Sequence, residues 1–143
     1  MDYLEWNDNK MSIGIKLIDE QHKELLKIIN KLSTSINENS QRKDILIIVN
    51  ELIGYASYHF TVEEELFNKF NYKDSEEHKK EHSLFVKKFR SIKNKISNDK
   101  VYLKKSAIEI SGEVFQYIVD WFLNHVVGSD KKYVELFKKN GIK

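Results

Sequence analysis

The sequence predicts an all-α protein: an up-down-up-down antiparallel four-helix bundle with an N-terminal arm and a short C-terminal helix. Three observations support this fold. The chain has no proline and few glycines, four segments carry core-type residues at alternating spacings of four and three, and the breaks between them are short. Short connections make consecutive helices antiparallel neighbours. At 143 residues the chain suits one domain over residues 1–143.

Each predicted helix has its own inward-facing stripe. The first stripe contains Ile18, His22, Leu25, Ile29, Leu32 and Ile36, and the second contains Leu52, Ala56, His59, Glu63, Leu66 and Phe70. The third contains His78, His82, Phe85, Phe89, Ile92 and Ile96, and the fourth contains Ala107, Ser111, Val114, Ile118, Trp121 and His125. All five histidines therefore lie on core stripes.

The segments outside the stripes predict the arm, the turns and the terminal helix. In the arm, Leu4, Trp6, Ile13 and Ile15 can pack over the bundle. Residues 37–41, 71–75 and 97–100 are rich in turn and capping residues, which marks the breaks between helices. After the fourth helix, a short terminal helix is predicted by Tyr133, Leu136 and Phe137.

Composition excludes several classes of protein. The absence of cysteine excludes disulfides, thiolate nucleophiles and sulfur ligands, so a bound metal must use nitrogen and oxygen. The 24 basic and 22 acidic residues are interspersed, with a formal charge of +2, which does not indicate nucleic acid. The start lacks signal-peptide features, and no window approaches the ~18 apolar residues of a membrane span. We expect a cytoplasmic monomer with no nucleic-acid or membrane partner.

The polar residues on the stripes meet at one end of the predicted bundle. The first and third helices carry them near their starts, whereas the second and fourth carry them near their ends. In an antiparallel bundle these positions share one level, which brings together His22, His59, Glu63, His78, His82 and His125, with Asp130 just beyond the fourth helix. Unpaired, such buried groups would cost roughly 1–3 kcal/mol each.

Metal binding explains this convergence. Residues four apart on a helix project from one face, as His59 and Glu63 do, and so do His78 and His82. Imidazole suits iron, zinc, copper and nickel, and a carboxylate can bridge two ions. Five nitrogens and two bridging carboxylates, with a solvent-derived bridge, predict two metals. Dividing the histidines three and two leaves one ion with an open position for a ligand.

The segments that carry these residues resemble the hemerythrins, particularly the bacteriohemerythrins. They are Asp19–Leu25, His59–Glu64, His78–His82 and His125–Asp130, in the family order. The resemblance implies that His78, His82 and His125 hold one iron and that His22 and His59 hold the other. Glu63 and Asp130 would bridge these two Fe²⁺/Fe³⁺ ions, together with an oxo or hydroxo group from solvent.

The resemblance also implies the function, which is reversible dioxygen binding without turnover of a substrate. Oxygen would bind at the iron of His22 and His59, in a pocket that excludes water and anions. Its lining would comprise Leu25, Phe60, Trp121, Phe122 and Val126. Within the family, oxygen storage, delivery and sensing stay open, as does an enzyme acting on oxygen, peroxide or nitric oxide. The protein that receives the oxygen is unknown.

Two other classes of protein compete with this interpretation. His78–His82 matches the H-x-x-E-H pattern of inverzincin zinc proteases, but that leaves three histidines unexplained, and Glu81 is expected on the solvated side between lysines. Ferritin-like di-iron proteins use paired Glu-x-x-His segments. The nearest spacing here is Asp19-x-x-His22, which occurs once. Both alternatives are therefore disfavoured.

Overall fold

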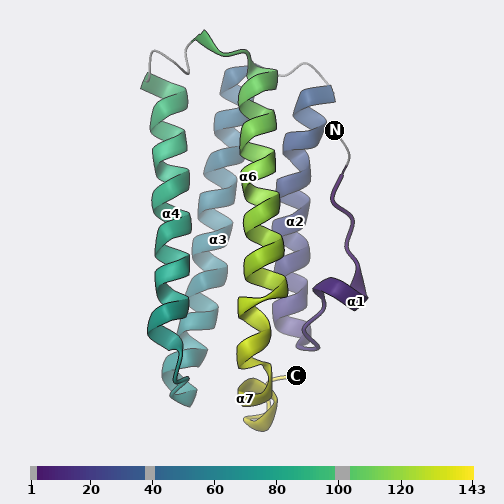
Figure 1. The fold of residues 1–143 in the computed structure, drawn as a ribbon, viewed down its shortest axis with the longest axis vertical. Coiled ribbons are helices and arrows are strands. Elements are labelled where there is room, and N and C mark those ends of the chain that lie inside the picture. Colours follow the sequence, from purple (N-terminus) through teal and green to yellow (C-terminus); the bar gives the residue numbers. More distant parts are fainter. Residues whose placement is uncertain (1–2, 38–40, 99–103) are drawn as a thin grey trace.

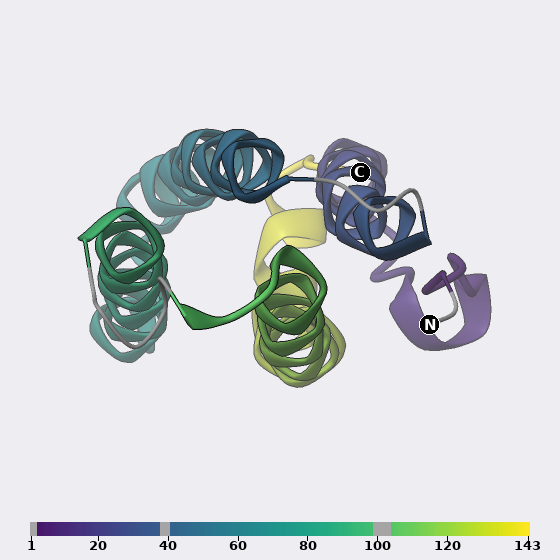
Figure 2. The same ribbon diagram turned by 90° about the horizontal axis from the view of Figure 1, so that it is seen from above.

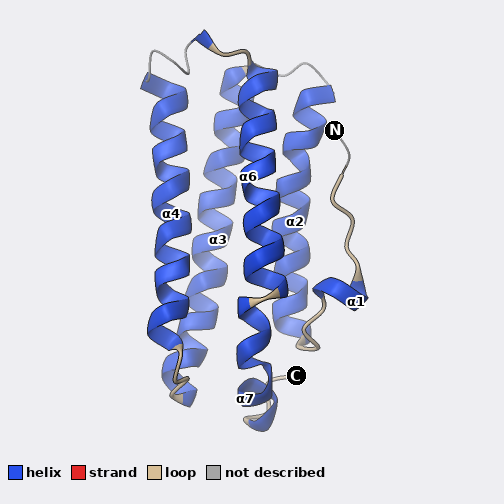
Figure 3. Cartoon of the chain, in the orientation of Figure 1, coloured by secondary structure: helices blue, strands red, loops and turns tan. Residues whose placement is uncertain are grey.

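The computed structural model describes residues 3–37, 41–98 and 104–143, and within these residues the chain forms helices and loops without strands (Figure 3). The four long helices are α2 (Lys16–Asn37), α3 (Arg42–Phe70), α4 (Ser75–Asn98) and α6 (Ala107–Val127). Three short elements accompany them: α1 (Asp8–Met11), the 3₁₀ helix η1 (Ser129–Tyr133) and α7 (Val134–Lys139). This confirms the predicted all-α bundle with an arm and a terminal helix.

The long helices run alternately up and down around one core (Figures 1 and 2). Helix α2 packs against α3 and α6, and α3 packs against α4. Between α4 and α6, aromatic side chains fill the space: the ring centroids of Phe85 and Trp121 are 4.4 Å apart, and those of Phe89 and Tyr117 are 5.5 Å apart. The bundle therefore closes on all four sides, with its polar stripe residues at the end where α7 lies.

Local signals set the ends of the helices. Ser106 caps α6, because its side chain accepts a hydrogen bond from the Glu109 N–H at 3.1 Å. Asn71 ends α3 in the left-handed conformation, with φ of 53°. The break predicted at residues 71–75 is confirmed, since α4 begins at Ser75. The other two predicted breaks lie partly at residues 38–40 and 99–103, outside the described residues.

The N-terminal arm is fastened to α2 by two sets of hydrogen bonds. The backbone N–H and C=O of Leu4 each bond to the Asn30 amide at 2.9 Å. Further along, the Asp19 carboxylate accepts from the Ser12 hydroxyl at 2.6 Å and from the Ile13 N–H at 2.9 Å. The second set holds the arm at the first turn of α2. It therefore fixes the part of α2 that carries His22.

The predicted stripes match the buried faces of the helices, except at two positions in α3 and two in α6. Four predicted stripe residues are only partly buried: Leu66, Phe70, Ala107 and Trp121. Phe67 is buried in place of its neighbour Leu66, and Phe122 in place of its neighbour Trp121. A straight helix has 3.6 residues per turn, so a stripe written with a period of 3.5 moves off the core after a few turns, as it does at the end of α3. In α6, Trp121 is partly buried although Ile118 before it and His125 after it on the stripe are buried. The side chain of Ile36 lies outside the described residues.

One expectation about membranes needs correction. Helix α3 is long and apolar enough to cross a membrane by length and composition, although no window was expected to approach this limit. Its apolar residues Ile45, Val49 and Leu52 are fully buried in the bundle. Core helices of soluble proteins pass the same test, so one such helix is weak evidence for a membrane span.

Candidate metal centre

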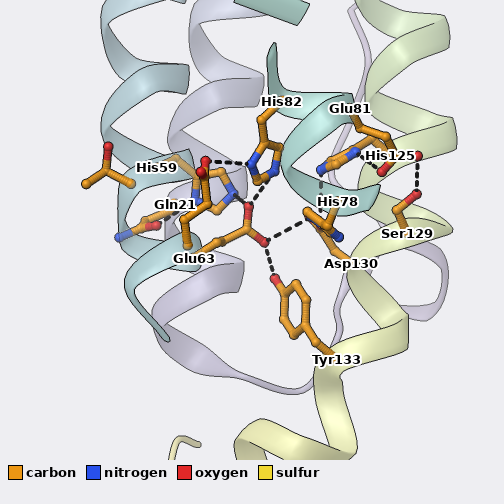
Figure 4. Close-up of polar contacts among 12 residues, drawn as sticks. Gln21, His59, Glu63, His78, Glu81, His82, His125, Ser129, Asp130 and Tyr133 are labelled. Carbon is orange, nitrogen blue, oxygen red and sulfur yellow. Dashed lines mark hydrogen bonds and ion pairs between the residues drawn. The ribbon is translucent and has the colours of Figure 1, made fainter. Parts of the chain in front are cut away.

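All seven predicted ligand residues meet at the end of the bundle. Figure 4 labels six of them, His22 being the exception. They come from the start of α2, the end of α3, the start of α4, the end of α6 and η1, and no residue among them is more than 4% exposed. Gly128 allows η1 to turn back toward the core, because a Cβ at this position would lie 2.5 Å from the backbone oxygen of Asn124. That turn brings Asp130 under the four helices.

The ligand atoms form two groups that share both carboxylates. One contains His78, His82 and His125 with Glu63 and Asp130, and the other contains His22 and His59 with the same two carboxylates. Within each group the ligand atoms lie within 4.8 Å of one another. The three-and-two division of the histidines coincides with the division that the resemblance implies.

Asp130 lies between histidines of both groups. Its Oδ2 is 2.9 Å from Nε2 of His22, and its Oδ1 is 2.9 Å from Nε2 of His78 and 3.1 Å from Nε2 of His125. One carboxylate thus presents one oxygen to each group. This is the arrangement that bridging two cations requires.

Glu63 joins the remaining histidines and a tyrosine. Its Oε1 lies 3.1 Å from Nε2 of His59 and 3.3 Å from Nε2 of His82. Its Oε2 accepts a hydrogen bond from the buried hydroxyl of Tyr133 at 2.5 Å. Across the centre, the Nε2 atoms of His22 and His59 face each other at 3.2 Å.

The central atoms fit a metal because many of them make no satisfactory hydrogen bond. Six atoms at the centre are buried without a hydrogen-bond partner, although they lie at short ion-pair distances. They are both oxygens of Asp130, Oε1 of Glu63, and Nε2 of His78, His82 and His125. So many unsatisfied polar atoms would be costly in a dry core. Cations among these imidazole and carboxylate donors would satisfy them together.

Charges at the centre are strongly coupled. Burial and mutual repulsion oppose ionisation of Glu63 and Asp130, but the surrounding histidines outweigh both effects and lower the pKa of each carboxyl. Burial likewise opposes protonation of His125, yet Asp130 and Glu81 raise its pKa to about 10. The His59 pKa is also raised, against its burial, by Glu63 and Asp130. Without a metal, protons on these imidazoles therefore balance the two carboxylates.

Hydrogen bonds from outside the centre orient two imidazoles. Nδ1 of His59 donates to Oε1 of the buried Gln21 side chain at 2.6 Å, and Nδ1 of His82 donates to Glu64 at 3.0 Å. A proton held on Nδ1 leaves the Nε2 lone pair for the centre. Sequence reasoning missed Gln21 and Glu64, although each directly neighbours a predicted ligand.

Glu81 pairs with His125 by charge and not by a hydrogen bond. One Glu81 oxygen lies 3.1 Å from Nδ1 of His125, and the other accepts from the Ser129 hydroxyl at 2.9 Å. The expectation that Glu81 faces solvent is therefore only partly right, since its side chain is 45% exposed but engaged at the site. Glu81 contacts the outer nitrogen of His125, so it is not placed as the base of a zinc protease. Asp19, the residue considered for a ferritin-like pair, is engaged with the arm.

Three of the five predicted pocket residues are aromatic and pack against histidines of the centre. Phe122 is fully buried, and its ring packs edge-on against His22 with centroids 6.3 Å apart. Trp121 stacks on His125 at 4.4 Å, against the three-histidine group. Phe60 contacts both groups, because it stacks on His82 at 3.8 Å and its ring centroid is 6.0 Å from that of His59. Leu25 and Val126 are buried in the main core. Phe122 is thus the predicted pocket residue whose ring faces His22.

Comparisons with known proteins agree with this geometry. The chain is 28% identical over 138 residues to a bacteriohemerythrin of Stenotrophomonas maltophilia, covering 96% of this chain and 84% of that protein. It is 32% identical over 126 residues to a hemerythrin-like protein of Naegleria gruberi, covering 88% and 87%. A crystal structure of wild-type hemerythrin has the same fold, with a TM-score of 0.80 at 24% identity over 94% of this chain and 98% of that one. Residues 13–137 match the family described as the hemerythrin HHE cation binding domain, and the chain therefore belongs to the hemerythrin family.

Proposed function

We propose that this protein binds dioxygen reversibly at a non-haem di-iron centre and does not act as an enzyme. The observation that carries the proposal is the pair of histidine groups that share Glu63 and Asp130. Two cations held by common carboxylates suit a two-electron change at one small ligand. Membership of the hemerythrin family supports dioxygen as that ligand.

The geometry supports a specific distribution of ligands. The group of His78, His82 and His125 would hold one iron, and the group of His22 and His59 would hold the other, with Glu63, Asp130 and a solvent-derived oxygen between them. Ligand atoms of nitrogen and oxygen alone suit iron. When bound, the two irons would supply one electron each to oxygen. The group of His22 and His59 offers one imidazole fewer than the other group, so a ligand would bind on its side.

Residues around the centre would keep that binding reversible. The outer contacts of His59 and His82 hold their Nε2 lone pairs toward the metals. Phe122 covers His22 and would keep water and anions from the open position. Below the centre, the Tyr133 hydroxyl holds one oxygen of Glu63 in place. These residues orient ligands of the centre and shield it.

Iron content and visible spectra test the proposal. Protein produced with sufficient iron is expected to contain about two irons per chain, since seven ligands exceed the coordination number of one ion. Spectra of the anaerobically reduced protein should change in air and return when oxygen is removed. A value near one metal, or zinc after production with iron, would contradict a di-iron centre.

The same spectra separate oxygen binding from an enzyme. A change in air that does not reverse, accompanied by peroxide consumption or nitric oxide turnover over many cycles, would favour a di-iron enzyme. Reversal over repeated cycles supports binding. Storage, delivery and sensing would then differ in oxygen affinity and in the partner protein. The chemistry at the metal site would be the same in all three.

A further inference from the structure

The outer partners of the two histidine groups differ in charge. In the three-histidine group, His82 and His125 each face a carboxylate, Glu64 at 3.0 Å and Glu81 at 3.1 Å. In the two-histidine group, His59 faces the neutral amide of Gln21 at 2.6 Å. Nδ1 of His22 and Nδ1 of His125 are both buried without a hydrogen-bond partner, but Nδ1 of His125 lies within ion-pair distance of a carboxylate, that of Glu81. Negative charge therefore surrounds only one of the two groups at this distance.

Such a difference changes the electron density that the histidines give to a metal. A carboxylate that accepts the Nδ1 proton makes the imidazole a stronger donor, which favours the ferric ion and lowers its reduction potential. A neutral amide fixes the ring in the same orientation but has less effect on its basicity. The backbone and the ligand set can thus remain the same while the two metals differ in how easily they lose an electron.

We propose that Glu64, Glu81 and Gln21 set the order in which the two irons are oxidised. Resting on the di-iron function proposed above, this inference assigns the lower reduction potential to the three-histidine iron. Gln21 keeps the two-histidine iron, with its open position, in the ferrous state. The three side chains touch no reacting atom, so they are positioning residues that act through His82, His125 and His59.

Burial predicts which substitution has the larger effect. Glu64 is 32% exposed at its side chain and Glu81 is 45% exposed, so solvent weakens the influence of both charges. Gln21 is only 6% exposed, so a charge introduced there is weakly screened. Replacing Gln21 with glutamate is therefore expected to shift a potential more than removing the charge of Glu64.

The first test compares two neutralised glutamates on α3 in the iron-loaded protein. Glu64→Gln keeps a hydrogen-bond acceptor for His82 and removes its charge, and Glu65→Gln removes the same charge from an exposed position one residue away. Spectroelectrochemical titration should show the first oxidation step of Glu64→Gln raised by about 28 mV, equivalent to a threefold change in the ferrous-to-ferric ratio. Glu65→Gln should match the wild type. Equal potentials in the two variants would overturn the proposal.

The second test introduces charge beside the open iron. Gln21→Glu should lower the second oxidation step by about 59 mV, a tenfold change in the ferrous-to-ferric ratio, and should speed autoxidation. The double variant Gln21→Glu/Glu64→Gln has the wild-type net charge. It should bring the two steps closer together or reverse their order, which Mössbauer spectra of the half-oxidised protein would detect. Unchanged steps in the double variant would contradict the inference, and Glu64→Gln decides alone if Gln21→Glu does not fold.

Failure of this inference is distinguishable from failure of the proposed function. If wild-type spectra do not reverse after oxygen removal, reversible binding is wrong, yet the potentials still report the effect of the outer partners. If binding is reversible but the reduction potentials do not change on substitution of Glu64 and Gln21, the proposed function is retained and the inference about these residues is wrong. Iron content of about two per chain in every variant shows that the substitutions act on potential and leave ligation intact.

Discussion

Replacing Tyr133 with phenylalanine removes one oxygen atom from the floor of the metal centre. The Tyr133 side chain is fully buried, and its hydroxyl donates to Oε2 of Glu63 at 2.5 Å. Because Glu63 is ionised in a dry site, this is a hydrogen bond to a charged acceptor. Its surroundings raise the pKa of the tyrosine well above its usual value, through burial first and then the charges of Asp130 and Glu63, so the hydroxyl keeps its proton.

The size of the effect follows from that charge. A hydrogen bond to a charged group contributes ~1.5–3 kcal/mol, and its loss leaves Glu63 with one less donor. For a domain of this size, a loss of about 2 kcal/mol lowers Tm by roughly 4–8 °C. Urea unfolding and thermal unfolding of the metal-free protein at pH 7 should both show this difference between Tyr133→Phe and the wild type.

Tyr72→Phe is the matched control for this experiment. Tyr72 packs in the same apolar cluster, with its ring centroid 6.3 Å from that of Tyr133, but makes no hydrogen bond with the seven central residues. Tyr72→Phe keeps the buried ring and leaves the hydrogen bond to Glu63 intact, so it should change the free energy of unfolding by less than the ~1.5–3 kcal/mol expected for Tyr133→Phe. Equal losses in Tyr133→Phe and Tyr72→Phe would refute the role of the hydroxyl.

Three further predictions concern the ligands, the pocket and pH. Glu63→Ala should retain less iron by elemental analysis than His22→Ala, because Glu63 belongs to both ligand groups, and two full irons in Glu63→Ala would show that it is not a bridge. Phe122→Ala should speed autoxidation by about tenfold, or ~1.4 kcal/mol of barrier, with iron retained. Phe89→Ala, an equally buried change in the core away from the ligands, should leave that rate unaltered. Since the pKa of His125 is raised to about 10, its contribution to the stability of metal-free protein should be complete below about pH 6.5 and lost as pH rises toward 10. Urea unfolding at pH 6, 8 and 10 measures this loss, and stability that rises over this range would contradict a protonated His125.

The bundle and the convergence of the seven residues could be predicted because both depend on helical periodicity. Residues four apart share a face, and antiparallel helices place the end of one beside the start of the next. Helical periodicity thus places four of the residues at one level of the bundle, whatever the exact interhelical angles are: His59, Glu63, His78 and His82. A small error in period accumulates at Leu66 and Phe70 in α3, and the stripe of α6 also departs from the buried face at Ala107 and Trp121.

The outer contacts could not be predicted in the same way. Gln21 and Glu64 lie next to ligands in the sequence, on flanks of their helices that periodicity alone assigns to the boundary with solvent. Whether such a side chain reaches an imidazole nitrogen depends on its rotamer and on the distance between helices. Tyr133 was recognised as apolar core for a terminal helix, but its hydroxyl meets Glu63 only because η1 is a 3₁₀ turn directly after Gly128.

The position of Asp130 couples the metal centre to the C-terminal segment. Four helices supply the other six central residues, but Asp130 comes from η1, which is held by the stacking of Tyr133 on Phe137 at 4.3 Å. Both aromatic residues belong to a second apolar cluster that also contains Ile13 and Ile15 of the arm. The arm and the terminal helix thus close the same end of the bundle, and through Asp130 any bound cations would link this cluster to the main core. Metal binding to a folded site adds directly to the free energy of unfolding. Because η1 supplies Asp130, bound metal should stabilise the C-terminal segment against local unfolding.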